Sequence, residues 1–329
     1  MKKNQKKGHF VISLDFEKLW GVRDKRTIND YGNDIKNVSA IIERTLELFE
    51  KFHIKATFST VGLLFAESKD EILEHCPTIK PSYDNENLSP YNGHFELIKS
   101  KSDVDPYHFA PDSILLIKSY NQDIGTHTFS HYYCMEKGQT KEQFRADIIS
   151  SLNIAKKYNI EQSSIVFPRN YVNMEYLNTL SELGIKSYRG NLDHWAYRVL
   201  EHNLKKKAQR LYRFLDAYLN LSGLNTHSLN QSSITCVPMN VPASRFLRPY
   251  SNKLRFLEPL KQKRIKNGMT HAAKYGKLYH LWWHPHNFGS NMEQNFQGLE
   301  DILKHFKFLS ETHDYKSASM ESLTHELNS

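Results

Sequence analysis

The chain has 329 residues, of which 39% are hydrophobic and 24% are charged, and its formal net charge is +8. It can bury a sizeable core, but no run approaches the ~18 consecutive apolar residues of a membrane-spanning helix. Its three cysteines, Cys76, Cys134 and Cys236, are odd in number and widely spaced, which argues against a disulfide framework and fits a reducing compartment. Because no apolar stretch follows the N-terminal lysines, we expect no signal peptide and a cytoplasmic protein.

Strands and helices alternate along the chain, as the periodicity of its apolar residues indicates. We expect strands at 9–14, 54–60, 122–125, 164–167, 185–188, 277–283 and 315–318, with a further one at 234–237. We expect helices at 34–52, 140–158, 173–183 and 294–309. A strand, a helix and a second strand in succession imply a parallel crossover unit, and therefore an α/β fold.

Two long segments interrupt this alternation. Residues 66–112 carry five prolines and little periodicity, so we expect an excursion that is ordered only in part, of the kind that often forms a binding loop. Residues 195–275 are mostly helical in pattern and basic. We expect a single domain over 1–329 with these two segments as excursions from it.

A histidine pair, His127 and His131, follows the expected strand at 122–125. On a helical turn, a spacing of four places two imidazoles on one face, where they can bind one divalent metal ion. The pair alone is weak evidence, because a chain with 17 histidines will contain such a spacing by chance.

Reactive side chains recur just past the carboxyl ends of the expected strands. In parallel α/β barrels the catalytic residues gather at that rim, so the regularity predicts an active site there. The residues found at these strand ends are Asp15, Glu17, His127, His131, Arg169, Asp193, His284 and His286.

Four short stretches that contain most of these residues resemble, in their order along the chain, the motifs of the polysaccharide deacetylases, carbohydrate esterase family four. They read Ser-Leu-Asp-Phe-Glu at 13–17, His-Thr-Phe-Ser-His at 127–131, Phe-Pro-Arg-Asn at 167–170 and Trp-Trp-His-Pro-His at 282–286. The resemblance covers residues 9–195 and 277–320 and implies a distorted (β/α)7-type barrel with parallel strands. It also implies removal of acetyl groups from N-acetylated sugars with a divalent metal, most often zinc.

The resemblance implies a role for each residue. Asp15 would be the catalytic base, Arg169 would hold it, and His284 would be the general acid. Asp193, close to Trp195, would belong to the fourth motif and orient the acid. The metal ligands would be Glu17, His127 and His131.

The chain departs from the family pattern in its first motif. Many members have two adjacent aspartates there, whereas Phe16 separates Asp15 from Glu17, and the glutamate is one methylene longer. Which of the two carboxylates binds the metal therefore stays open. His286 is an alternative to His284 as the acid, since both face the same side of a strand.

Several residues near these motifs are expected to contact the substrate. Backbone N–H groups of Asn170 or Tyr171 are candidates for holding the oxyanion. The residues expected to bind substrate are Trp195, Tyr171, Asn170 and His286.

The sequence thus predicts a metal-dependent hydrolase that removes an N-acetyl group from a glycan, a nucleotide sugar or a lipid-linked saccharide. Alternatives are a deformylase-like amidase on a lipid-linked sugar and an inactive glycan-binding module of the same fold. The basic region at 198–277 is either a solvated surface or a face for a phosphate-bearing carrier or the inner membrane surface, rather than for nucleic acid. Its apolar stripe either packs on the barrel or lies on lipid; the stripe comprises Leu200, Leu204, Leu211, Phe214, Leu215, Tyr218 and Leu221.

Overall fold

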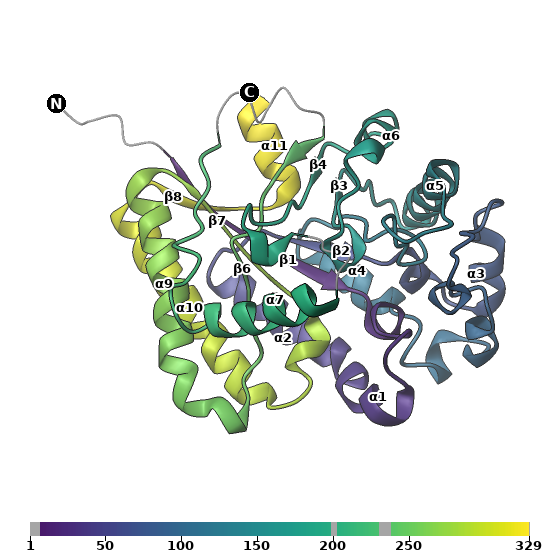
Figure 1. Cartoon of the computed structure of the whole chain (residues 1–329), viewed down its shortest axis with the longest axis horizontal. Helices are drawn as coiled ribbons and strands as arrows, with labels where there is room; N and C mark the ends of the chain where they lie inside the picture. Colours follow the sequence, from purple (N-terminus) through teal and green to yellow (C-terminus); the bar gives the residue numbers. More distant parts are fainter. Residues whose placement is uncertain (1–6, 199–202, 230–237, 329) are drawn as a thin grey trace.

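The computed structural model describes residues 7–198, 203–229 and 238–328 (Figure 1). It is a parallel α/β fold built on two sheets, one in the strand order β2-β1-β7-β6 with β8 also beside β1, the other in the order β3-β4-β5. Every strand pair in these sheets is parallel. The strands are β1 (Gly8–Phe16), β2 (Ala56–Thr60), β3 (Ser164–Ile165), β4 (Ser187–Tyr188), β5 (Met239–Asn240), β6 (Arg245–Phe246), β7 (Leu278–Trp283) and β8 (Tyr315–Ala318).

Isolated bridges join the two sheets, so the strands surround one interior although the described residues form no closed sheet. Thr60 pairs with Thr126, and Thr126 pairs in turn with Ile165 of β3. The predicted strand at 122–125 therefore exists only as bridge residues between β2 and β3. On the other side, β5 pairs with β4 while the following β6 pairs with β7. This arrangement agrees with the predicted barrel-like α/β fold.

Strand β1 lies at the centre of the larger sheet, and its two faces differ. Its even-numbered residues, from Phe10 to Phe16, belong to the main hydrophobic cluster, which also contains side chains of the surrounding helices. Since side chains alternate along a strand, Ser13 and Asp15 lie on the opposite face. In β7, Tyr279, Leu281 and Trp283 likewise join the cluster and leave His280 and Trp282 on the other face.

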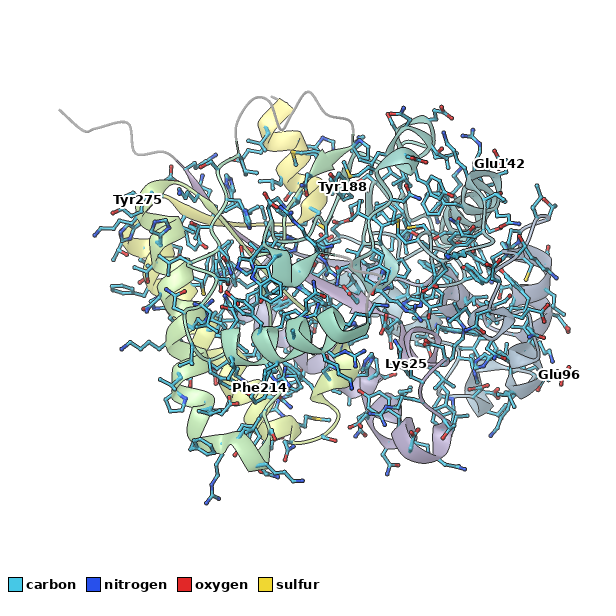
Figure 2. The ribbon with its side chains drawn as sticks, in the orientation of Figure 1. Lys25, Glu96, Glu142, Tyr188, Phe214 and Tyr275 are labelled. Carbon is cyan, nitrogen blue, oxygen red and sulfur yellow. The ribbon has the colours of Figure 1, made fainter. Side chains whose placement is uncertain are left out.

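Helices cover the outside of the strands, and side chains fill the space between the layers (Figure 2). Figure 1 shows α9 and α10 side by side at one end of the molecule and α3 and α5 at the other. The α-helices are α1 (Ile28–Lys36), α2 (Val38–Lys51), α3 (Lys69–His75), α4 (Pro111–Ser119), α5 (Lys141–Lys157), α6 (Leu177–Glu182), α7 (Asn203–Asp216), α9 (Glu258–Tyr275), α10 (Met292–Thr312) and α11 (Met320–Asn328).

The predicted helix at 34–52 is instead two helices, α1 and α2, which meet at Asn37. The predicted excursion at 66–112 contains α3, three short 3-10 helices and the start of α4, which has its proline at the first position, where no N–H is needed. In the predicted excursion at 195–275, the described residues form α7 and α9 together with the short strands β5 and β6 and two 3-10 helices. The strand predicted at 234–237 lies outside the described residues.

None of the helices in the described part of the chain combines the length and apolar character needed to cross a membrane. The apolar stripe predicted along α7 is divided. Tyr218 is buried and Phe214 half-buried, but Leu211, Leu215 and Leu221 are exposed. The side chains of residues 200 and 204 lie outside the described part.

Candidate active site

Asp15, Glu17, His127 and His284 line one cavity of about 590 Å³ at the carboxyl ends of the parallel strands. Asp15 is near the end of β1, Glu17 directly follows that strand, and His284 directly follows β7. His127 comes just after the bridge residue Thr126. The barrel rim predicted from the strand ends therefore brings together side chains more than 260 residues apart in the sequence.

The Glu17 carboxylate lies between the two histidines of the pair. Its Oε2 is 3.2 Å from His127 Nε2 and 3.1 Å from His131 Nε2. All three side chains are buried, and their candidate ligand atoms lie within 4.8 Å of one another. Two imidazoles and one carboxylate are a usual ligand set for a catalytic zinc site, which keeps further coordination positions open.

The local backbone at the histidine pair is not the helical turn that the spacing suggested. Residues 127–131 form an irregular loop in which Thr128 and His131 have positive φ angles of 64° and 56°. The buried carboxylate of Asp147 holds this loop by accepting hydrogen bonds from the Phe129 and Ser130 backbone N–H groups. A left-handed conformation at non-glycine residues is costly, and strain of this kind is concentrated at functional sites.

The hydrogen bonds around the two histidines leave ring nitrogens available to bind a cation. His127 Nδ1 donates to the Val166 carbonyl oxygen at 2.8 Å, which leaves Nε2 with a lone pair toward Glu17. His131 Nδ1 is buried without a hydrogen-bond partner among the described residues, and its Nε2 faces the Glu17 carboxylate. Burial lowers the pKa of His131 to about 4. Lone pairs of two imidazoles and a carboxylate thus converge, and a divalent cation fits them.

Glycine at position 21 makes room for the Glu17 carboxylate. A Cβ at Gly21 would overlap the carboxylate atoms. Burial disfavours the charged form of Glu17, but the imidazoles of His284, His127 and His131 keep its pKa well below the ordinary value.

Arg189 holds Asp15. Its two terminal nitrogens each donate to one Asp15 oxygen at 2.7 Å, and both side chains are buried. Burial disfavours the charged form of Asp15, but the Arg189 guanidinium, helped by His127 and His284, lowers the pKa of the carboxyl below its ordinary value. Arg189 also donates to Ser13 Oγ at 2.9 Å and to Asn170 Oδ1 at 2.6 Å, and it lies 4.2 Å from the Trp282 ring centre.

The expectation that Arg169 holds Asp15 is wrong. Arg169 has a positive φ of 59°, and its guanidinium pairs with Asp24 at 2.5 Å and Glu136 at 2.6 Å. The sequence held a signal for Arg189, because that residue directly follows the strand predicted at 185–188. The resemblance to a family motif directed attention to the preceding strand end instead.

His284 reaches both carboxylates. Its Nε2 is 3.7 Å from Asp15 Oδ2 and 3.6 Å from Glu17 Oε1, and the ring is partly accessible from the cavity. Its Nδ1 lies 3.2 Å from Asn287 Oδ1. The neighbouring His286 is buried and stacks on His284, and burial, followed by the charge of His284, lowers the pKa of His286 to about 4. His286 lines a second cavity, of about 320 Å³, which shares Glu17 and His284 with the first.

The structure does not bring Asp193 to His284. Asp193 is exposed and pairs with Arg198, so Asn287 occupies the orienting position expected for it. Trp195 is 48% exposed, packs on Tyr212 and does not line the cavity. Both expectations for this region came from the resemblance to the fourth motif of the family.

Asn170 and Tyr171 do line the cavity, as predicted for substrate contacts. Their backbone N–H groups, however, donate to the carbonyl oxygens of Phe167 and Pro168 at 2.9 and 3.2 Å. The expected oxyanion contact from these N–H groups is therefore absent, because a tight turn already uses both donors.

The model of the polysaccharide deacetylase family matches residues 26–188. That stretch contains His127 and His131, whereas Asp15, Glu17 and His284 lie outside it and fold against it. The chain belongs to the polysaccharide deacetylase family. Membership of this family supports a carbohydrate deacetylase activity.

Solved structures share the fold of this chain. A protein assigned as a polysaccharide deacetylase from Mycobacterium smegmatis superposes with a TM-score of 0.61 at 12% identity, over 100% of this chain and 93% of that one. One assigned likewise from Pseudomonas aeruginosa gives 0.52 at 11% identity, over 96% and 89%. At these identities the likeness is one of fold. A comparison with curated proteins finds no match.

Proposed function

We propose that this protein is a metal-dependent amidohydrolase that removes the acetyl group from an N-acetylated saccharide. The observation that carries the proposal is the position of Glu17 between His127 and His131, beside a buried Asp15 that Arg189 orients. Two of the three ligands, Glu17 and His127, thus line one cavity with a carboxylate base and a histidine acid, and the third ligand, His131, contacts Glu17.

The chain's own residues supply the proton transfers of amide hydrolysis. Water attacks the acyl carbon, and Asp15 accepts the proton that the water loses. When the C–N bond breaks, His284 donates a proton to the leaving amine, so the products are a free amino sugar and acetate. Arg189 fixes both oxygens of Asp15 and prevents the base from rotating away from the cavity.

Glu17, His127 and His131 would hold a divalent cation, and zinc suits a set of two imidazoles and one carboxylate. A cation bound there would supply Lewis acidity, which polarises the acyl carbonyl and acidifies water. Trp282 and Phe246, whose ring centres are 4.7 Å apart, line the cavity and offer apolar surface to a sugar ring. A cytoplasmic location, a single domain and a phosphate-bearing or membrane-associated partner stay predictions.

Two variants test this function together. Wild-type protein should contain about one zinc or similar ion per chain by elemental analysis and should release acetate from at least one of a panel of N-acetyl sugars. Asp15→Asn should keep the metal and lose turnover, whereas His127→Ala should lose both. His325→Ala, in an exposed residue of α11, is the control and should change neither. Full turnover by Asp15→Asn, or metal retained by His127→Ala, would refute the assignment of roles.

A further inference from the structure

The wall of the cavity opposite the strand ends is strongly cationic. Seven of the side chains that line the cavity are Lys or Arg, against two carboxylates, Asp15 and Glu17. Asp15 is already neutralised by Arg189, which does not line the cavity itself. Most of the positive charge therefore has no counterpart in the machinery proposed for amide hydrolysis.

Three of the seven cations have acidic partners. Arg169 pairs with Asp24 and Glu136, Arg198 pairs with Asp193, and Arg245 pairs with Asp216. For the other four, no carboxylate in the described part of the chain lies within ion-pair distance. These four form what we call the cationic wall: Lys206, Arg210, Arg213 and Arg248.

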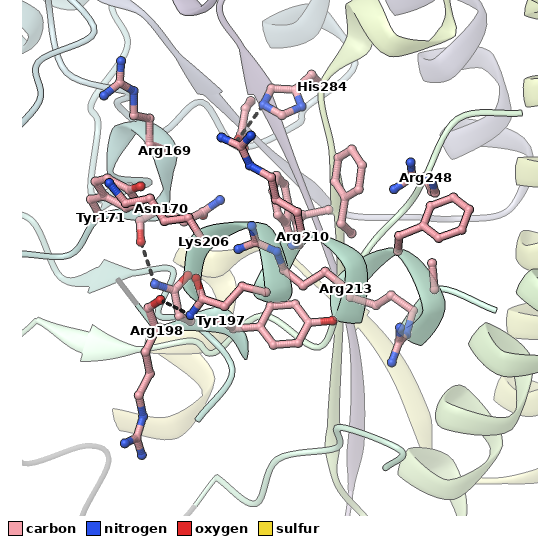
Figure 3. Close-up of a pocket in the computed structure, with 18 of the residues that line it drawn as sticks. Arg169, Asn170, Tyr171, Tyr197, Arg198, Lys206, Arg210, Arg213, Arg248 and His284 are labelled. Atoms are coloured by element: carbon pink, nitrogen blue, oxygen red, sulfur yellow. Dashed lines mark hydrogen bonds and ion pairs between the residues drawn. The ribbon is translucent and has the colours of Figure 1, made fainter. Parts of the chain in front are cut away.

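The cationic wall is built from one helix face and one adjacent segment. Lys206, Arg210 and Arg213 are spaced by four and three residues, which places them on the same face of α7. Figure 3 shows them along the helix, with Arg248 from the segment after β6 nearby. From the first to the last of the three is about 10 Å along the helix axis at 1.5 Å per residue.

Buried hydrogen bonds fix the helix that carries the wall. At its last residue, Asp216, the carbonyl and carboxylate oxygens accept hydrogen bonds from Arg264 at 2.6 Å, and the carbonyl accepts one from Arg245 at 3.0 Å. Further up the helix, the buried Gln209 side chain donates to the carbonyl oxygens of Trp195 and Arg198. Lys206, Arg210 and Arg213 are therefore presented toward the cavity on a docked helix, and Arg248 joins them from the segment after β6.

Unpaired cations gathered at one wall repel one another, and a neutral sugar would leave this repulsion in place. An anion with several oxygens and more than one charge would relieve it, and guanidinium groups match phosphate geometry especially well. We propose that the saccharide substrate carries a phosphate or diphosphate group, which binds the cationic wall while its N-acetyl group lies against Asp15, Glu17 and His284. This inference rests on the proposed function and names the substrate class of the same site.

Two sources can supply this chemistry, a soluble nucleotide sugar and a saccharide on a lipid diphosphate. The exposed Leu211 and Leu215 of α7 provide apolar surface on the same helix, which suits a lipid tail leaving the cavity. The substrates to compare are therefore UDP-N-acetylglucosamine, N-acetylglucosamine on a polyprenyl diphosphate in neutral lipid vesicles, and uncharged N-acetylglucosamine oligomers.

The decisive variant is Arg210→Gln combined with Arg213→Gln, because it removes charge from the wall and touches none of the proposed catalytic residues. On the preferred phosphate-bearing substrate, KM should rise roughly 10- to 100-fold with kcat little changed. Turnover of the uncharged oligomers should stay the same. The matched control is Lys207→Gln, an exposed neighbour on α7 that does not line the cavity, and it should behave as wild type.

A binding measurement separates failure of this inference from failure of the proposed function. Inorganic diphosphate, titrated calorimetrically into the wild type and the double variant, should bind the wild type and bind the double variant roughly 10-fold or more weakly. That result would support the cationic wall even if no acetyl sugar were turned over. Equal affinity in the two proteins, or a preference for uncharged oligomers over both phosphate-bearing substrates, would overturn it.

Discussion

The two walls of the active-site cavity hold their charged groups in opposite ways. On the strand-end wall, Asp15 and Glu17 are buried, and each carboxylate contacts an arginine or histidines at defined distances. On the cationic wall, Arg210 and Arg213 are exposed, and no carboxylate of the described residues pairs with them. The strand-end wall holds its carboxylates in fixed positions, whereas the cationic wall presents exposed positive charges, mostly on the docked helix α7.

This difference follows from the work that each wall is proposed to do. Proton transfer depends on reacting atoms placed within hydrogen-bond reach, so its residues come from buried strands and the loops that follow them. Attraction of an anion acts over a longer range and tolerates side-chain motion, so a helix surface suffices. Changes on the strand-end wall should therefore alter turnover and stability, and changes on the cationic wall should alter substrate affinity.

The largest expected effect separates His284 from His286. His284→Ala removes the proposed proton donor and should slow hydrolysis of an N-acetyl sugar roughly 10²- to 10⁴-fold. On an activated acetyl ester, whose leaving group needs little protonation, the same variant should lose much less. The measurement is kcat/KM on both substrates for His284→Ala and for His286→Ala. Equal losses on both substrates, or a stronger leaving-group dependence for His286→Ala, would move the acid role away from His284.

A second comparison is between two arginines of the cavity region. Arg189→Met leaves the buried Asp15 carboxylate without its partner and should lower the free energy of unfolding by about 3–5 kcal/mol. Arg169→Met is the matched change at a partly exposed arginine whose partners, Asp24 and Glu136, keep some contact with solvent. Its cost should be clearly smaller. Urea unfolding of both variants measures the difference, and equal costs would contradict the assignment of Arg189 as the partner of a buried charge.

Asp123, a buried acid with no cationic partner among the residues that the structure describes, gives the third and smaller effect. Asp123 accepts hydrogen bonds from Thr57 at 2.6 Å and Ser164 at 3.5 Å, and burial raises its pKa from 3.8 to about 7. Between about pH 4 and pH 7 the folded protein therefore keeps a proton that the unfolded chain loses. Since the folded state binds more protons in this window, the contribution of Asp123 to stability falls as the pH rises.

Urea unfolding between pH 4 and pH 8 measures this slope, and Asp123→Asn is the control because the amide does not titrate. Subtracting the variant's free energy of unfolding from that of the wild type cancels the groups that both proteins share. The difference should fall across this window and level off above about pH 7. A difference that stays flat, or that rises with pH, would show that Asp123 is ionised in the folded protein.

Most of the strand-end wall could be predicted from the sequence, because it depends on two local rules. Buried parallel strands appear as short apolar runs, and the residues after their ends share one rim, which placed Asp15, Glu17, His127 and His284 together. What local patterns could not give is the choice among several residues at that rim. Arg189 and Arg169 both follow predicted strands, and only the left-handed turn at 169–170 directs Arg169 to Asp24 instead.

The position of the cationic wall at the cavity could not be predicted from the sequence. The basic character of residues 198–277 was evident, but a charged helix face is equally compatible with plain solvent exposure. Which face of α7 meets the cavity depends on Asp216 and Gln209, whose partners Arg264, Arg245 and the 195–198 carbonyls come from other elements. Tertiary docking of this kind has no signature in local periodicity.

Ionic strength offers the mildest test of the contrast between the walls. From about 0.1 M to about 1 M salt the screening length falls from about 10 Å to about 3 Å, which weakens exposed charge pairs far more than buried ones. The KM of a phosphate-bearing substrate should therefore rise several-fold, whereas kcat, which depends on the buried Asp15 and Arg189, should change little. Combining Arg210→Gln with Arg213→Gln should flatten the dependence of KM on salt, and Lys207→Gln should leave it unchanged. If the double variant kept the full salt dependence, the phosphate contacts would have to come from cations other than those on α7.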